Sequence, residues 1–175
     1  RGQVERLRWD VGAFSLRYNN RTGTLTGDAA GDDNFYILRT NIGNSITNGL
    51  EIFGEYSLLQ REDGGITVFT STALFKSKYL SAHIRRGNEN ISITGNKIES
   101  VPDIITRNGI TFRYKPFSIS FLYSYTGETF ADPLNTVEPS PSGSVGIVPA
   151  YGLLDINASL KIYTNLLVRF NIGNA

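Results

Sequence analysis

Apolar and polar side chains alternate with a period of two along most of the chain, which predicts strands rather than helices. The clearest stretch is Phe117 to Glu128, where one face is apolar and aromatic and the other is small and polar except for Leu122. Gly152 to Ile162 repeats the alternation, with Leu154 and Ile156 on the apolar face. Such alternation predicts antiparallel strands, each with one apolar and one polar face.

Five further segments divide in the same way into an apolar and a polar face. In the N-terminal half the predicted apolar positions are Phe14, Leu16 and Tyr18, then Leu50, Ile52, Tyr56 and Leu58, then Phe69, Ala73, Phe75 and Tyr79. In the C-terminal half they are Ile104, Ile110, Phe112 and Tyr114, then Leu166, Val168, Phe170 and Ile172. We expect the charged residues of the strands to share the opposite, water-facing side, namely Glu51, Glu55, Lys76, Lys78, Arg107, Arg113, Asp155, Lys161 and Arg169.

The connections between these segments alternate in length. Short turns are predicted near Glu5–Leu7, Arg61–Gly65, Lys115–Pro116 and Tyr163–Asn165, and long polar loops at Arg21–Asn34, His83–Val101 and Ala131–Pro149. An up-and-down meander gives this alternation when all turns of one kind lie at the same end of the sheet. We therefore predict an all-β, antiparallel up-and-down sheet of about six full strands with a partial strand at each end.

Composition excludes several classes of function. With Lys+Arg 17 and Asp+Glu 16 the net charge is +1, too balanced for a protein dedicated to nucleic acid, and we predict no nucleic-acid partner. The chain has no cysteine and a single histidine, so neither a thiolate site nor a two-histidine metal site is predicted. No nucleophile elbow, phosphate loop or dinucleotide fingerprint occurs, and we expect no catalytic residues and no cofactor.

The length of the strands favours a membrane barrel. The chain lacks the run of about 18 apolar residues that a transmembrane helix needs, whereas its alternating stretches of about ten to twelve residues could cross a bilayer as tilted strands. Tyrosines near the strand ends suit an interfacial girdle: Tyr18, Tyr56, Tyr79, Tyr114, Tyr125 and Tyr151. In such a barrel the apolar sides face lipid and the charged sides face a wet lumen. A soluble β-meander that binds a carbohydrate or other ligand, and a passive porin, are the alternatives.

Three stretches resemble the C-terminal part of the β-barrel of TonB-dependent outer-membrane transporters. Asn41–Glu51 is similar to the Asn-x-Gly and Gly-hydrophobic-Glu strand of that family, and Gly95–Asp103 to its polar loop followed by a proline and a strand. Phe130–Tyr151, with Phe-Ala-Asp, Asn-Thr-Val-Glu and Pro-Ala-Tyr in that order, most resembles the ferric citrate (iron dicitrate) receptor branch. Phe170–Asn174 resembles the penultimate strand, although Ile172–Gly173 departs from its usual spelling.

The resemblance implies a transmembrane barrel of about 22 strands in the bacterial outer membrane. Residues 1–175 would then be a fragment of one barrel domain, without the N-terminal plug domain and the last strand, and the absence of methionine at position 1 agrees with a longer polypeptide. The implied function is uptake of a ferric chelate similar to ferric citrate. The implied partners are that chelate, the TonB complex through the missing N-terminal part, outer-membrane lipid and lipopolysaccharide.

His83, Arg85 and Arg86 are the candidate substrate-binding residues. They follow a predicted strand on a loop that the implied topology places outside the cell. Guanidinium groups are planar and pair with carboxylates through two hydrogen bonds, which suits an anionic citrate chelate. A solvated loop, or contacts with the phosphates of lipopolysaccharide, are the alternative interpretations of these residues.

Overall fold

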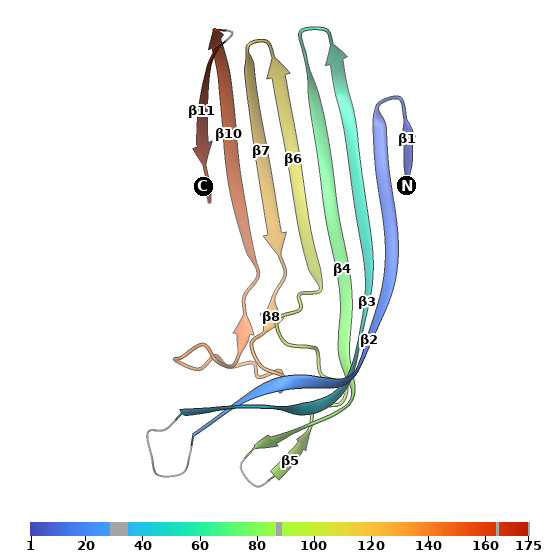
Figure 1. Cartoon of the computed structure of the whole chain (residues 1–175), viewed down its shortest axis with the longest axis vertical. Coiled ribbons are helices and arrows are strands. Elements are labelled where there is room, and N and C mark those ends of the chain that lie inside the picture. The colour runs from blue at the N-terminus through green and yellow to red at the C-terminus, as the bar shows by residue number, and fades with distance from the viewer. Residues whose placement is uncertain (29–34, 87–88, 164, 175) are drawn as a thin grey trace.

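The chain folds into one long, curved antiparallel sheet (Figure 1). The computed structural model describes residues 1–28, 35–86, 89–163 and 165–174, and the side chains of these residues except those at 24–40 and at 86. The strands are β1 (Gly2–Val4), β2 (Leu7–Asp28), β3 (Phe35–Arg61), β4 (Gly64–Arg86), β5 (Glu89–Ser92), β6 (Ile104–Tyr114), β7 (Phe117–Thr126), β8 (Thr129–Phe130), β9 (Ile147–Val148), β10 (Tyr151–Tyr163) and β11 (Leu166–Ile172). Over these residues there is no helix, and hence none long and apolar enough to cross a membrane.

The sheet is an up-and-down meander, as the sequence predicts. Its order is β1-β2-β3-β4-β6-β7-β10-β11, β5 pairs with the far end of β4, and β8 pairs with β9 in a small separate ladder. The predicted short turns are confirmed, since they separate β1 from β2, β3 from β4, β6 from β7 and β10 from β11. These turns lie at one end of the sheet and the long connections at the other (Figure 1). We call these the turn end and the loop end.

The predicted loop at Arg21–Asn34 is instead largely strand. β2 continues to Asp28, which pairs with Phe35 at the start of β3; residues 29–34 lie outside the described part of the chain. This segment is rich in threonine, a β-branched residue that suits strands although it is polar. Polarity was therefore the wrong criterion for a loop here.

Each face of the sheet has its own chemistry. Residues paired across neighbouring antiparallel strands lie on the same face. One row of such partners runs across seven strands and is apolar throughout: Leu7, Tyr56, Val68, Ile110, Phe121, Ile156 and Ile172. A neighbouring row on the other face is polar throughout: Ser57, Thr67, Thr111, Ser120, Asn157 and Asn171. We call these the apolar face and the polar face.

Two of the predicted apolar sets belong to the polar face. Phe14 pairs with Gly49, beside Glu51, and Phe69 pairs with Glu55. The predicted sets that begin at Phe14 and at Phe69 therefore lie on the polar face, and their prediction as part of the apolar face is wrong. The ring of Phe14 lies over Gly49, where an added Cβ would meet it at 2.3 Å. In these strands both faces carry large apolar residues, so alternation within one strand cannot identify the face, and only pairing with neighbours does.

The same register corrects two of the nine predicted charged residues. Lys76 pairs with Asn48 and Lys78 with Ile46, which places both on the apolar face together with Leu50 and Leu74. The other seven, Glu51, Glu55, Arg107, Arg113, Asp155, Lys161 and Arg169, share the polar face.

The tyrosines of the predicted girdle are divided between the two faces. Tyr56, Tyr114 and Tyr125 lie on the apolar face, whereas Tyr18, Tyr79 and Tyr151 lie on the polar face.

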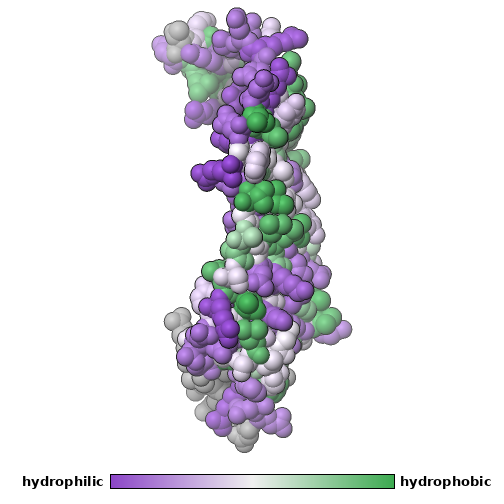
Figure 2. All heavy atoms as spheres, turned by 90° about the vertical axis from the view of Figure 1, so that its right-hand side faces the viewer, coloured by the Kyte–Doolittle hydropathy of each residue, from purple (hydrophilic) through white to green (hydrophobic). Residues whose placement is uncertain are grey.

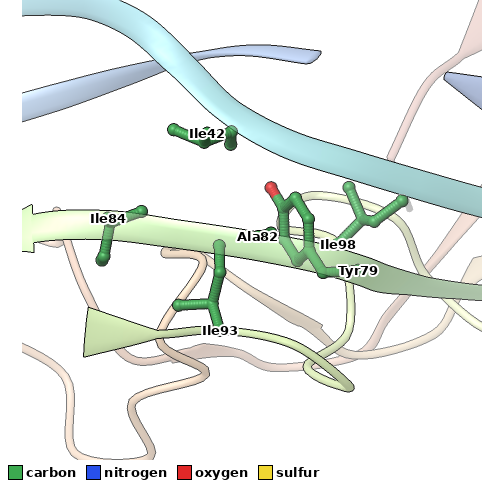
Figure 3. Close-up of a cluster of buried hydrophobic side chains, with 6 residues drawn as sticks. All are labelled: Ile42, Tyr79, Ala82, Ile84, Ile93 and Ile98. Carbon is green, nitrogen blue, oxygen red and sulfur yellow. The ribbon is translucent and has the colours of Figure 1, made fainter. Parts of the chain in front are cut away.

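Buried hydrophobic residues gather only at the loop end in the described part of the chain (Figure 3). The cluster consists of Ile42, Tyr79, Ala82, Ile84, Ile93 and Ile98. The middle of the apolar face is exposed by contrast, with Phe121 at 37% and Ile110 at 42% of full exposure. Figure 2 shows hydrophobic side chains along the middle of the long axis and mainly hydrophilic ones at both ends. The apolar face thus has no protein partner within this sheet.

The loop that follows β5 provides hydrogen-bond partners for the backbone at the edge of β4. β4 extends beyond the start of β6, so its outer backbone groups would have no partner there. The amide of Phe75 donates to Asp103 O, that of Tyr79 to Asn96 O, and that of Gly95 to Tyr79 O, each at 2.9 Å. The loop is therefore hydrogen-bonded to the edge of β4, in the place that a neighbouring strand would occupy.

The β2–β3 hairpin bends sharply toward the loop end (Figure 1), and each of its two strands has a residue with positive φ. Gly43 has a φ of 125°, and Asn20 on the paired strand has a φ of 58°. The backbone amide of Gly43 donates to the side-chain oxygen of Asn41 at 2.9 Å. A Cβ at Gly43 would lie 2.1 Å from the backbone oxygen of Ser81, so both conformation and space require glycine.

Gly43→Ala should destabilise the intact protein by about 2 kcal/mol or more, because alanine disfavours this φ and would displace the backbone of β4. Gly12→Ala is the matched control, since nothing lies within 4 Å of an added Cβ there. Denaturant unfolding of the two variants measures the difference. Equal stabilities would show that the bend is not held as described.

Candidate functional site

The loop after β5 and the loop after β7 bind each other at the loop end. Asn96 Nδ2 donates to Pro133 O at 2.9 Å, and the amide of Lys97 donates to Asn135 Oδ1 at 2.7 Å. Asn135 Nδ2 returns a hydrogen bond to Lys97 O at 2.9 Å. Two of the stretches that resemble transporter sequences, Gly95–Asp103 and Phe130–Tyr151, are therefore in direct contact.

Asp132 organises the second of these loops. Its side chain is only 6% exposed, and its carboxylate accepts hydrogen bonds from Leu134 N at 3.0 Å and Thr136 Oγ1 at 2.9 Å. The amides of Thr136 and Gly146 add two longer bonds at 3.3 Å. Hydrogen bonds to an ionised acceptor are strong, so this carboxylate ties both sides of the loop together. The sequence places Asp132 in the Phe-Ala-Asp motif that resembles the transporter family, but it does not show that this carboxylate holds the loop together.

A buried tyrosine, a glutamate and an arginine connect three segments at the same end. Tyr79 Oη donates to Glu99 Oε2 at 2.5 Å, and Arg21 Nη2 lies 3.4 Å from Glu99 Oε1. Tyr79 is 1% exposed, and burial together with the hydrogen bond to Glu99 raises the pKa of its hydroxyl. These three residues join β2, β4 and the loop between β5 and β6.

The seven charged residues of the polar face are spread over four strands, β3, β6, β10 and β11, rather than gathered in a cluster. Glu55 lies 3.5 Å from Arg8 of β2, and the Arg8 guanidinium lies 5.2 Å from the centre of the Phe53 ring. Arg8 and Glu55 thus form an ion pair between neighbouring strands. Glu51 takes part in no ion pair with any described residue.

The polar face is hollowed near the turn end by a cavity of about 600 Å³. Side chains of both charges line it, among them Glu55, Arg113 and Lys161. A hollow of this size with mixed charge suits water and ions. Across the described residues no group of three or more acidic, histidine or cysteine side chains could hold a metal ion.

The candidate substrate residues lie on the β4–β5 hairpin. His83 pairs with Ser92 and Arg85 with Asn90, and both side chains are exposed. Between them Ile84 points the other way, into the buried cluster (Figure 3). The hairpin thus presents His83 and Arg85 on one side, away from the core. The side chain of Arg86 lies outside the described part of the chain.

Comparisons with known proteins agree with this geometry. The family model for the β-barrel of TonB-dependent receptor-like proteins matches residues 1–175. The ferric citrate transporter FecA in its unliganded form has 20% sequence identity and a TM-score of 0.73, with 97% of this chain and 24% of that chain covered. The siderophore receptor PiuA of Acinetobacter baumannii has 17% identity and a TM-score of 0.66, with coverages of 97% and 22%.

A third solved structure, the FrpB iron transporter of Neisseria meningitidis (F3-3 variant), has 13% identity and a TM-score of 0.59, with 98% of this chain and 25% of that chain covered. The chain therefore spans about a quarter of the length of these proteins. No curated protein sequence matches it. The structural similarity shows the fold, and the match to the family model shows the family. The chain belongs to the family of TonB-dependent receptor-like β-barrels, which are proteins of the bacterial outer membrane.

Proposed function

We propose that this chain is part of the barrel wall of a receptor that imports a ferric chelate of the ferric citrate class, energised by the TonB complex. The family model supports a TonB-dependent receptor, and the three similar structures are named as a ferric citrate transporter, a siderophore receptor and an iron transporter. The sequence order of the Phe130–Tyr151 block, which resembles the ferric citrate branch, supports the finer assignment. The remaining strands and the plug would be supplied by the rest of a longer polypeptide.

The two-faced sheet is the observation that carries this proposal. An apolar row across seven strands with no protein partner is unstable in water but suits lipid. On β3 the apolar stretch from Leu50 to Leu59 measures about 30 Å at about 3.3 Å per residue, or about 23 Å in height at a tilt of about 40°. That height is close to the apolar band of about 25 Å in outer-membrane barrels. A soluble module would have to cover this face.

The polar face would then line the lumen. Its charged residues need water, because an unpaired lysine or arginine in the middle of the hydrocarbon layer costs about 2–4 kcal/mol. Arg107, Arg113, Lys161 and Arg169 give this wall a set of cations beside Glu51, Glu55 and Asp155. An anionic chelate released from the outer mouth would pass along such a wall without a strong barrier of either sign.

Capture of the chelate is assigned to the loop end. His83 and Arg85 are exposed on the β4–β5 hairpin, and Arg86 follows them in sequence. The positive charge of the two arginines suits the carboxylates of citrate, and a charge-assisted hydrogen bond is worth about 1.5–3 kcal/mol. The hydrogen-bonded loop that contains Asp132 and Asn135 forms a fixed base beside this hairpin, because Ile84 of the hairpin belongs to the buried cluster and Leu134 of the loop packs against it.

The orientation of the faces can be tested with two single lysine substitutions on β7. Phe121→Lys should destabilise the full-length protein in phospholipid vesicles by about 2–4 kcal/mol, because it puts a charge against lipid. Ser120→Lys, one residue away on the polar face, should cost less than about 1 kcal/mol. Urea unfolding in vesicles measures both values. A larger loss for Ser120→Lys would reverse the assignment of the two faces.

The substrate can be tested by uptake of iron. A strain without other ferric citrate uptake should grow on ferric citrate as its iron source when it carries the full-length protein and TonB, and should stop growing when TonB is removed. Arg85→Ala should weaken binding of ferric citrate by about tenfold or more. Lys115→Ala, at the turn end, is the control and should leave binding unchanged. Growth that is independent of TonB, or on other chelates only, would contradict the proposal.

A further inference from the structure

Three cations lie close together on the apolar face, toward the loop end. Arg17 pairs with Ile46, which in turn pairs with Lys78, so these residues form one row across β2, β3 and β4. The adjacent row consists of Ser15, Asn48 and Lys76. The next row toward the turn end, Ala13, Leu50 and Leu74, is apolar. Arg17, Lys76 and Lys78 therefore lie where the apolar stretch ends on the side of the loops.

These three cations are near neighbours. Lys76 and Lys78 are two residues apart on one strand, a separation of about 7 Å, and Arg17 lies two strands from Lys78, about 10 Å away. All three side chains are exposed. No carboxylate shares the apolar face with them among the paired residues whose side chains are described. Positive charge is thus concentrated on this side without compensation.

None of the three cations has a partner in the described part of the chain. The ion pairs of that part join Arg1 to Asp10, Arg8 to Glu55, Arg21 to Glu99 and Lys97 to Asp103. Arg17, Lys76 and Lys78 form neither an ion pair nor a side-chain hydrogen bond there. Three neighbouring cations of like sign repel one another unless an anion lies between them. Ser15 and Asn48 on the adjacent row add hydrogen-bonding groups at the same place.

We propose that Arg17, Lys76 and Lys78 form a binding site for the phosphate groups of glycolipid headgroups in the outer leaflet of the outer membrane. The inference rests on the proposed orientation of the apolar face toward lipid. Given that orientation, the rows of these residues lie at the level where acyl chains end and headgroups begin. Lysine and arginine at a membrane surface attract anionic headgroups, and a phosphate can bridge cations at this spacing.

Binding is measured with the full-length protein in phosphatidylcholine nanodiscs that contain bisphosphorylated lipid A, with native mass spectrometry as the readout. The triple variant R17Q/K76Q/K78Q should bind this lipid at least about tenfold more weakly than the unaltered protein. The matched control R107Q/R113Q/R169Q removes the same charge from the polar face and should bind as the unaltered protein does. The variant R17K/K76R/K78R keeps all three charges and should retain binding.

The outcomes separate this inference from the proposed function. Equal lipid binding by the two glutamine variants, or displacement of the lipid by inorganic phosphate alone at similar concentration, would overturn the headgroup site while the receptor function stands. If the unaltered protein does not insert into nanodiscs at all, the membrane orientation itself fails. If R17Q/K76Q/K78Q does not fold, binding of dephosphorylated lipid A to the unaltered protein is measured instead. Binding as strong as that of bisphosphorylated lipid A would overturn the site, and loss of binding would support it.

Discussion

The hydrogen-bonded register between neighbouring strands is the constraint on which the rest of this structure depends. It aligns Leu7, Val68, Phe121 and their partners in one row and Thr67, Thr111, Ser120 and theirs in the next, across the whole sheet. A slip of one residue in any pair would carry every later strand to the opposite face. The two faces can meet two different solvents only because this register is kept from β2 to β11.

The loop end follows a different physical rule. There β4 extends past the start of β6, and its backbone groups and side chains find their partners in the loops. The segment from Ile93 to Asp103 pairs with the free edge of β4, and Asp132 collects hydrogen bonds from both sides of its loop. The buried cluster around Tyr79 and Ile93 packs beneath them. Rigid, hydrogen-bonded loops on a rigid sheet are suited to present side chains such as Arg85 to a ligand.

The chemistry of the wall follows from its two surroundings. Charged residues of both signs are tolerated on the polar face because water solvates them, and Arg8 and Glu55 partly neutralise each other. On the apolar face the charged residues lie at the two ends of the apolar stretch, with Arg17, Lys76 and Lys78 toward the loop end and Arg61 at the turn end. In the proposed membrane orientation, the face and height of a charge decide whether it meets the lumen, the headgroups or a loop.

The sequence by itself determined the class of fold, the short turns and the faces of β6, β7 and β10. These are local properties: in Phe117–Tyr125 only one face is fully apolar, so alternation is sufficient, and the resembling motifs identified the family. Only the tertiary structure decided the faces of β2 and β4, since both faces of these strands carry large apolar residues and pairing with β3 chooses between them. It likewise decided the side of Lys76 and Lys78, and it brought Tyr79, Glu99 and Asp132 to the loop end. Such contacts join residues far apart in the chain, and no local pattern records them.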